Sequence, residues 1–265
     1  MIKILLARLR QGYRTMAYPG GPAPAMPDRF RGRARIDAAR CPGDCRRCQE
    51  ACPTGAIRWP EPSRAGPSGG AQVDLGRCLF CTDCAKACPH GAIRHEDDYR
   101  LAARRREDLL AGDDPIRLAQ PLERPLLGLL GRSLRLRQVS AGGCNACEAD
   151  TNVLGTVGWD IGRFGIQFVA SPRHADGLLI TGPVSENMKL GLEKTYLAVP
   201  SPKIVIAVGA CAISGGPYAG HPEVHNGAGS VVPVDLFIPG CPPHPLTLLD
   251  GLLRLLGKVA ESTPA

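Results

Sequence analysis

Twelve cysteines are the residues of this 265-residue chain whose type and spacing could do chemistry. Eight fall between residues 41 and 88, and four follow at wide intervals. Thiolates bind iron–sulfur clusters and zinc, whereas disulfides are typical of exported proteins. The start, MIKILLARLRQG, has a short apolar patch and no small-residue cleavage site, so we expect no signal peptide and a reducing cytoplasm. The cysteines are therefore predicted to be metal ligands.

Residues 41–95 contain an internal repeat. CPGDCRRCQEACPTGAIR, from Cys41, is matched by CLFCTDCAKACPHGAIR, from Cys78. Both resemble the CxxCxxCxxxCP signature, in which three close cysteines bind one 4Fe–4S cluster and the fourth, before proline, binds the other cluster. The repeat predicts two ligand sets: set 1 is Cys41, Cys45, Cys48 and Cys88, and set 2 is Cys52, Cys78, Cys81 and Cys84.

The first copy departs from this signature, because three residues rather than two separate Cys41 from Cys45. Gly43 could absorb the extra residue in a tight turn, but the departure puts ligation by Cys41 in question. Paired zinc ribbons are the alternative, since they also use close cysteine pairs. They do not need the third and fourth cysteines or the proline, so we favour iron–sulfur clusters.

The remaining cysteines follow strand-like runs. LRLRQVSAGG leads into Cys144, KIVIAVGA into Cys211 and VDLFIPG into Cys241. In an open parallel sheet, ligands gather beyond the carboxyl ends of the strands, so three loops would bring four thiolates to a third 4Fe–4S cluster. The alternatives are four buried structural thiols or a flavin site, although GACAISGG lacks a phosphate-loop pattern. We name these residues set 3: Cys144, Cys147, Cys211 and Cys241.

The second half of the chain alternates apolar, β-branched runs with helix-permitting stretches. Strands are expected at 166–170, 177–181, 203–208 and 231–238, and helices at 184–198 and 245–257. This alternation predicts an α/β domain over 139–260 with a flavodoxin-like parallel sheet. A small α+β ferredoxin-like domain of the bacterial two-cluster type is expected in front of it, over 37–98.

The other segments connect these two domains or precede them. Residues 99–138 are predicted to form a helical, proline-containing linker with a helix over 101–111. Residues 1–36 are predicted to form an N-terminal helix, apolar at positions 2, 5, 6 and 9, and an extended arm rich in proline and glycine. We expect this helix to pack on a partner subunit, with a membrane surface as the alternative.

The basic residues are concentrated in the first half. Residues 1–140 carry 25 Lys and Arg against 15 Asp and Glu, and residues 141–265 carry 7 against 10. Cations near a cluster offset its negative charge; a solvated surface or a nucleic-acid patch are the alternatives. The aromatic content of 5% argues against a base-stacking nucleic-acid module. No segment approaches the ~20 apolar residues that span a bilayer.

Several motifs resemble a known family. GGCNACE, SPRHAD, GACAISGGPY and IPGCPPHP are similar to the small, electron-transferring subunit of membrane-bound nickel–iron hydrogenases of the formate-hydrogenlyase type, and to the 20 kDa-type subunit of respiratory complex I. Residues 1–110 resemble that hydrogenase's two-cluster ferredoxin-like subunit, through Tyr18-Pro19, FRGR at 30–33 and LGRCLFC. The chain thus looks like a fusion of two normally separate subunits. Its Cys144-Asn-Ala-Cys147 spacing is that of the hydrogenases, whereas in the complex I relative this site starts with adjacent cysteines.

The resemblance implies an electron-transfer subunit that relays electrons through three 4Fe–4S clusters to or from a large catalytic subunit, which interconverts protons and H₂. Three clusters use all twelve cysteines, so we expect no nickel, flavin or nucleotide on this chain. Further implied partners are integral-membrane subunits and an upstream electron-donor protein, at the inner face of the cell membrane, with no nucleic acid. A complex I-like oxidoreductase, quinone-linked or nickel-free, and a zinc-stabilised scaffold are the alternatives.

Individual roles are also implied by the resemblance. Glu148, directly after the CxxC motif, is a candidate for proton transfer, with a solvated or interface carboxylate as the alternative. Ala146 stands where the hydrogenase relatives usually have glycine, and Asp150 where they usually have glutamate. Arg173 and His174 match the PRHAD motif, and a structural hydrogen-bonding role is expected for them.

Overall fold

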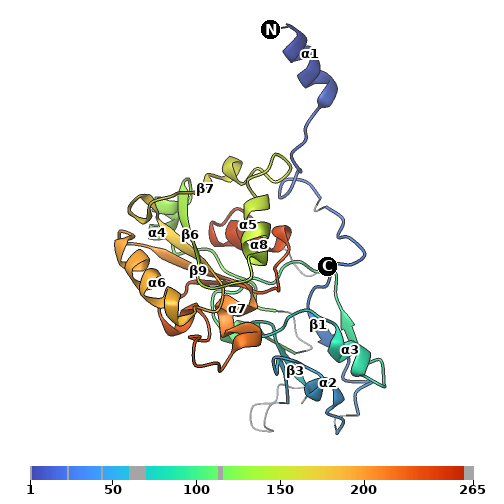
Figure 1. Ribbon diagram of the computed structural model, residues 1–265. Coiled ribbons are helices and arrows are strands. Elements are labelled where there is room, and N and C mark those ends of the chain that lie inside the picture. The colour runs from blue at the N-terminus through green and yellow to red at the C-terminus, as the bar shows by residue number, and fades with distance from the viewer. Residues whose placement is uncertain (1, 23, 43, 60–69, 113–115, 260–265) are drawn as a thin grey trace.

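The computed structural model describes residues 2–22, 24–42, 44–59, 70–112 and 116–259. Gly43, which was expected to absorb the extra residue between Cys41 and Cys45, lies outside the described residues. A small cysteine-rich domain, which contains α2 (Arg47–Glu50) and α3 (Asp83–Ala87), lies beside a larger α/β domain, and α1 (Ile2–Gln11) projects from the far end of the molecule (Figure 1).

The α/β domain is built on a five-stranded parallel sheet in the order β10-β9-β8-β6-β7. Its strands are β6 (Leu134–Ser140), β7 (Ile166–Phe168), β8 (Gly177–Thr181), β9 (Ile204–Val208) and β10 (Leu236–Ile238). The predicted strands are confirmed, and the fold class with them. The run 166–170 ends two residues early, at Phe168, and the run 203–208 begins one residue late, at Ile204. The run 231–238 is shortened most: Pro233 has no N–H to donate to a ladder, and the strand begins three residues after it.

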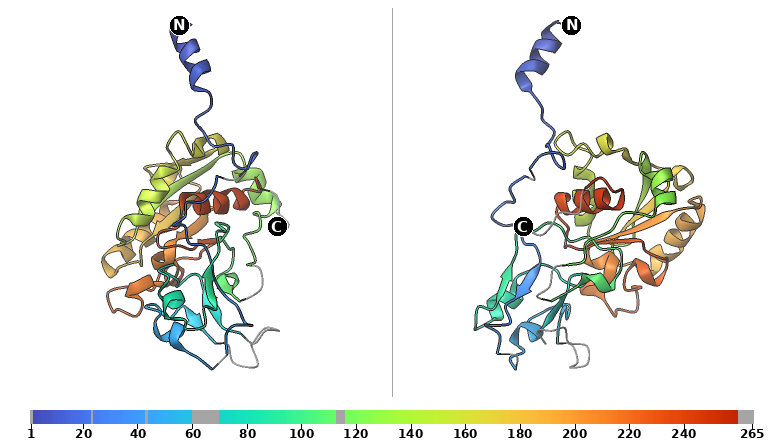
Figure 2. Two further views of the ribbon diagram at one scale, coloured as in Figure 1. Left: turned by 90° about the vertical axis from the view of Figure 1, so that its right-hand side faces the viewer. Right: turned by 180° about the vertical axis from the view of Figure 1, so that it is seen from behind.

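Helices cover both faces of the sheet, which explains why every position of β8 and β9 is buried and why β9 is apolar throughout. One face packs on α4 (Arg124–Leu130), α5 (Ala146–Val153) and α8 (Pro245–Leu255). The other face packs on α6 (Glu186–Ala198), α7 (Gly209–Ser214) and the small domain. Figure 2 shows these layers in two further views.

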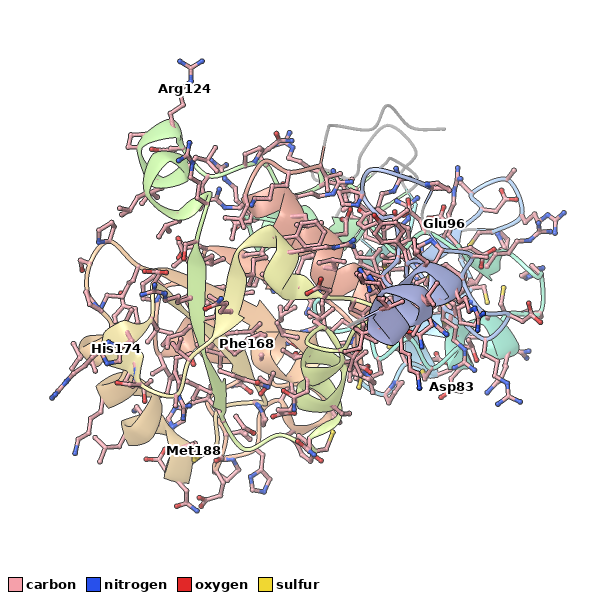
Figure 3. The ribbon with its side chains drawn as sticks, turned by 90° about the horizontal axis from the view of Figure 1, so that it is seen from above. Asp83, Glu96, Arg124, Phe168, His174 and Met188 are labelled. Atoms are coloured by element: carbon pink, nitrogen blue, oxygen red, sulfur yellow. The ribbon has the colours of Figure 1, made fainter. Side chains whose placement is uncertain are left out.

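The small domain holds two short antiparallel sheets. β1 (Ala34–Ile36) pairs with β4 (Ile93–His95), while β3 (Gln72–Asp74) lies between β2 (Ile57–Arg58) and β5 (Leu110–Ala111). β1 lies within the segment that was expected to be an arm. With α2 and α3, these strands give the expected α+β ferredoxin-like unit. Figure 3 shows Asp83 and Glu96 on this side of the molecule, and Arg124, Phe168, His174 and Met188 on the α/β side.

The helix predicted over 101–111 is wrong. Residues 107–109 form a single 3-10 turn, Glu107–Leu109, and the chain then enters β5. Ala103 pairs with Phe237 beside β10: its N–H donates to the Phe237 carbonyl at 3.0 Å, and the reverse bond is 2.8 Å. Backbone pairing with distant segments has overridden local helix propensity here. The segment therefore joins the two domains through the sheet rather than spacing them apart.

The N-terminal arm is fixed along both domains, while α1 is not. Tyr18 is buried and its hydroxyl donates to Asp250 Oδ1 of α8 at 2.7 Å. Further along, Arg33 forms an ion pair of 2.9 Å with Glu96. α1 contains the four predicted apolar positions and has no buried residue. Among the described residues, no helix is long and apolar enough to cross a membrane.

Candidate iron–sulfur sites

Set 1 surrounds one hollow in the small domain. All four of its cysteines line this hollow, together with Ile36 of β1 and Ile93 of β4. Cys41 is among them despite its three-residue gap. Burial raises the pKa of the Cys48 thiol, and the nearby sulfurs of Cys41 and Cys88 raise it further. The chain fold therefore gathers Cys88, from the second half of the repeat, with cysteines of the first half.

Set 2 surrounds a second hollow in the same domain, and again all four cysteines line it. Burial raises the pKa of Cys78 to about 12, with smaller contributions from Cys84, Cys52 and Cys81. Burial likewise raises the pKa of Cys84 to about 11. A buried thiol keeps its proton unless a metal ion takes the place of that proton. Both hollows therefore favour a positively charged occupant.

Backbone amides point at the sulfurs in both hollows. The N–H of Ala56 donates to Cys52 Sγ at 3.2 Å, and the N–H of Ala92 donates to Cys88 Sγ at 3.4 Å. The two bonds occupy the same position of the repeat, four residues after each Cys-Pro cysteine. The N–H of Phe80 donates to Cys78 Sγ at 3.3 Å. Such bonds stabilise thiolates and tune cluster potentials. The matching Gly-Ala pairs of the repeat were the sequence signal for them.

Set 3 lies where the sheet topology predicts it, beyond the carboxyl ends of β6, β9 and β10. Burial raises the pKa of Cys147, and negative charge on four nearby side chains raises it further: Glu148, Cys211, Cys241 and Cys144. Burial raises the pKa of Cys211 to about 11. Cys144 and Cys241 are exposed, so set 3 opens onto the surface of the chain.

Two glycines shape the walls of set 3. A Cβ on Gly209 would lie 2.6 Å from Cys147 Sγ, and a Cβ on Gly216 would lie 2.8 Å from Cys211 Sγ. Both glycines also have left-handed backbones, with φ of +88° and +56°. Only glycine fits here without strain. Gly209 stands two residues before Cys211 and Gly216 five residues after it.

The three sets form a series. Cys84 of set 2 is near enough to Cys48 of set 1 for their charges to interact. Cys81 of set 2 and Cys241 of set 3 interact in the same way. These last two line one cavity of about 370 Å³ between the domains, with Arg31, Asp150 and His244 also in its wall. Set 2 is therefore the middle member of the series.

Glu148 is held beside set 3 and is not solvated. It is 6% exposed, and its Oε1 accepts hydrogen bonds of 2.6 Å from both Ser140 and Thr181. These hydroxyls come from the carboxyl ends of β6 and β8, so the sheet itself fixes the carboxylate. The expectation of a solvated carboxylate is wrong, because the first turn of α5 points Glu148 into the sheet edge. The two hydroxyl partners had no distinctive sequence signal.

In the PRHAD motif, the structural hydrogen bond is made by Asp176 and not by Arg173 or His174. Arg173 and His174 are exposed. Asp176 makes the structural bond, because its Oδ2 accepts from the backbone N–H of Arg135 at 2.7 Å. This contact ties the start of β8 to β6.

The donor sets fit 4Fe–4S clusters. Each set offers four thiols, sets 1 and 2 line hollows with amide donors, and set 3 has walls in which a Cβ would meet the sulfurs. Within the described ranges, no group of three or more His, Cys, Asp or Glu side chains is placed to hold a single metal ion. A cluster instead binds each thiolate through a different iron.

Two family profiles match the chain. The profile of the NADH ubiquinone oxidoreductase 20 kDa subunit matches residues 144–255, and that of the 4Fe–4S dicluster domain matches residues 38–92. The first covers most of the α/β domain with set 3, and the second covers sets 1 and 2. The second match makes this chain an iron–sulfur protein.

Named relatives match about half of the chain. A Pyrococcus furiosus protein named probable membrane-bound hydrogenase subunit mbhJ is 40% identical over 51% of this chain and 81% of its own length. Formate hydrogenlyase subunit 7 of Escherichia coli is 41% identical over 53% of this chain and 55% of its own length. An NADH-quinone oxidoreductase subunit of Clostridium beijerinckii is 44% identical over 44% of this chain and 70% of its own length.

One similar solved chain comes from a membrane-bound sulfane sulfur reductase, an archaeal respiratory membrane complex. It is 33% identical, with a TM-score of 0.45 over 51% of this chain and 75% of that chain. The extent of the match to the Pyrococcus protein, together with the family profile, decides the assignment. The chain belongs to the family of the 20 kDa subunit of NADH ubiquinone oxidoreductase, and it carries a 4Fe–4S dicluster domain ahead of the domain that defines this family.

Proposed function

We propose that this chain is the electron-transfer subunit of a membrane-bound nickel–iron hydrogenase complex. One 4Fe–4S cluster on each set would supply a chain of one-electron carriers to or from a large catalytic subunit that interconverts protons and H₂. The observation that carries the proposal is the series of sets: Cys48 and Cys84 lie on the contacting helices α2 and α3, and Cys81 and Cys241 line one cavity.

The polypeptide would hold these carriers and bury them to different degrees. Sets 1 and 2 lie within the small domain, whose amides donate to the sulfurs of Cys52, Cys78 and Cys88. The basic excess of residues 1–140 offsets the negative charge of thiolate-bound clusters. Set 3 is the exposed member, so the large subunit would cover Cys144 and Cys241.

Nickel is expected on the partner, because all twelve cysteines of this chain are assigned to the three sets. We expect no flavin or nucleotide here either. Glu148, buried beside Cys147, is the candidate that would pass protons between this chain and the partner's metal. Its Oε1 is already occupied by two hydroxyls, which hold the carboxylate in one orientation.

A complex I-like oxidoreductase, with a quinone or another acceptor in place of protons, is the second candidate. It is favoured by relatives named as NADH-quinone oxidoreductase subunits, such as that of Clostridium beijerinckii. The two residues between Cys144 and Cys147 favour the hydrogenase, because this spacing resembles hydrogenase small subunits. Nickel in the purified partner would decide for the first candidate.

The assembly around the chain follows from the same proposal. Membrane-bound complexes are named among the relatives, which supports integral-membrane subunits as further partners. The chain would then be cytoplasmic and peripheral on the inner face of the cell membrane. An upstream electron-donor protein would deliver electrons at set 1, the far end of the series, and no nucleic acid is involved.

Metal analysis of the anaerobically purified chain tests the proposal. We expect about twelve iron and twelve sulfide per chain, with no stoichiometric nickel. About eight iron would mean that one set holds no cluster, and stoichiometric zinc with little iron would contradict the proposal altogether. The complex purified with its large subunit should in addition evolve H₂ from a reduced donor and contain nickel.

A further inference from the structure

The helix α1 carries an apolar stripe that the chain itself leaves uncovered. Ile2, Leu5, Leu6 and Leu9 recur at the spacing of one helix face, and these side chains are 47% to 79% exposed. No residue of the helix is buried. In both views of Figure 2, α1 stands clear of the two domains. A stripe of four large apolar side chains in water requires an external surface to cover it.

Cationic side chains flank this stripe and no anionic ones do. At 3.6 residues per turn, Lys3 and Arg10 lie along one border of the stripe and Arg8 lies along the other; Arg14 follows the helix. Residues 1–27 contain no Asp or Glu. Long basic side chains can extend to the level of phosphates while an apolar face sinks below them. The charge pattern fits an anionic surface and repels a second copy of the helix.

Further exposed groups lie where the arm joins the body. Tyr13 is 91% exposed and Val157 is 71% exposed. They belong to the same end of the molecule, because the Thr15 hydroxyl donates to the Val157 carbonyl at 2.9 Å and the Met16 N–H donates to the Gly158 carbonyl at 3.0 Å. Tyrosine is enriched at membrane–water interfaces. Tyr13 in the arm and Val157 on the body thus lie at the end of the molecule from which α1 projects (Figure 2).

We propose that α1 binds an anionic lipid surface directly, with its apolar stripe in the acyl region and Lys3, Arg8 and Arg10 on lipid phosphates. The proposal takes the membrane surface, named above as the alternative, in place of a partner subunit as the surface that covers the helix. The proposal goes beyond electron transfer and does not depend on it. It assigns to this chain its own contact with the membrane, in addition to any contact made by integral-membrane partners.

Vesicle co-sedimentation of the full iron-loaded chain tests the proposal. The chain should pellet with vesicles of phosphatidylglycerol and phosphatidylcholine and much less with phosphatidylcholine alone, and salt should weaken the binding. Each basic residue near an anionic surface contributes a factor of about five. The triple variant K3Q/R8Q/R10Q should therefore bind on the order of 100-fold more weakly. The variant L5Q/L9Q should not pellet.

Matched controls separate a specific contact from general stickiness. Leu190 and Leu197 of α6 are also exposed, at 59% and 77%, so L190Q/L197Q removes equal apolar surface elsewhere. R124Q/R173Q removes exposed charge away from α1. Both controls should pellet like the parent chain. Failure of the parent chain to bind anionic vesicles, or equal loss in a control, would overturn the proposal, as would a helix found buried against an acidic subunit in the purified complex.

The same samples keep this inference apart from the proposed function. Iron content and the visible absorbance of the clusters should be equal in the parent chain and every variant, since α1 touches none of the three sets. If the anaerobically purified chain contains no iron and still binds anionic vesicles, the electron-transfer proposal is refuted and the lipid contact is supported.

Discussion

Replacing Gly209 by alanine should empty set 3 and leave sets 1 and 2 intact. The added Cβ would lie 2.6 Å from Cys147 Sγ, so the sulfur must move by roughly 1 Å to reach an ordinary contact distance. Metal–ligand bonds tolerate only about 0.2 Å. The left-handed backbone at φ +88° adds a cost of about 1–2 kcal/mol for a residue with a Cβ. Both effects act on the turn between β9 and Cys211.

Two other glycines serve as controls that separate the backbone strain from the close contact with sulfur. Gly220 has a similar φ of +85° with nothing within 4 Å of an added Cβ. Gly220→Ala should cost about 1–2 kcal/mol of stability and keep every cluster. Gly191 lies within α6, and its added Cβ meets only Met188 Cε at 3.9 Å. Gly191→Ala should stabilise the chain by about 0.5–1 kcal/mol.

The assay combines iron analysis, EPR of the dithionite-reduced protein and thermal unfolding. For Gly209→Ala we expect iron to fall from about twelve to about eight per chain, with the signal of one cluster missing. Gly220→Ala should unfold earlier and retain about twelve iron. If Gly209→Ala also retains about twelve iron and all three signals, the Cys147 sulfur does not lie against Gly209, and the geometry described for set 3 is incorrect.

Three further perturbations test other parts of the site. Cys211→Ala should abolish hydrogen turnover by the complex while sets 1 and 2 still take electrons from dithionite; turnover without the third cluster would refute a linear relay. Glu148→Gln can still accept from Ser140 and Thr181, so clusters should assemble and turnover should fall with a larger solvent isotope effect; unchanged turnover would remove Glu148 from the proton path. In the iron-free chain, burial raises the pKa of Cys84 from 9.0 to about 11. The folded chain therefore holds this proton more tightly than the unfolded chain does, and the resulting contribution to folding stability is present below pH 9 and is lost as pH rises toward 11. Thermal unfolding between about pH 8 and pH 10.5 should show that loss in iron-free protein and not in iron-loaded protein.

Sequence periodicity predicted the parallel sheet well and the connection between the domains poorly. The buried strand β9 is apolar at every position, and this pattern depends only on local residues. Ala103, in contrast, pairs with Phe237, more than a hundred residues away, and no local pattern encodes that contact. The helix-favouring composition of 101–111 was therefore misleading.

The candidate ligands could be grouped from sequence because each group has a positional rule. Cys52 and Cys88 precede prolines in a repeat, and set 3 follows strand ends. The hydroxyls that hold Glu148 could not be found in this way. Ser140 and Thr181 are ordinary residues at strand ends, and only the β6–β8 register, which pairs them, brings both to one carboxylate oxygen.

Joining the two units in one chain has a physical consequence for the spacing of the sets. Cys52 of the first repeat lines the hollow of set 2, and Cys88 of the second repeat lines the hollow of set 1. This exchange fixes the positions of sets 1 and 2 relative to each other. Set 3 belongs to the other domain, so its distance from set 2 depends on how firmly the domains are joined. Backbone bonds between Ala103 and Phe237, and the bond of 2.9 Å from Ser214 Oγ to the Gly76 carbonyl, span that boundary. Because tunnelling rates fall steeply with distance, fixing Cys81 relative to Cys241 within a single chain would keep electron transfer independent of subunit concentration.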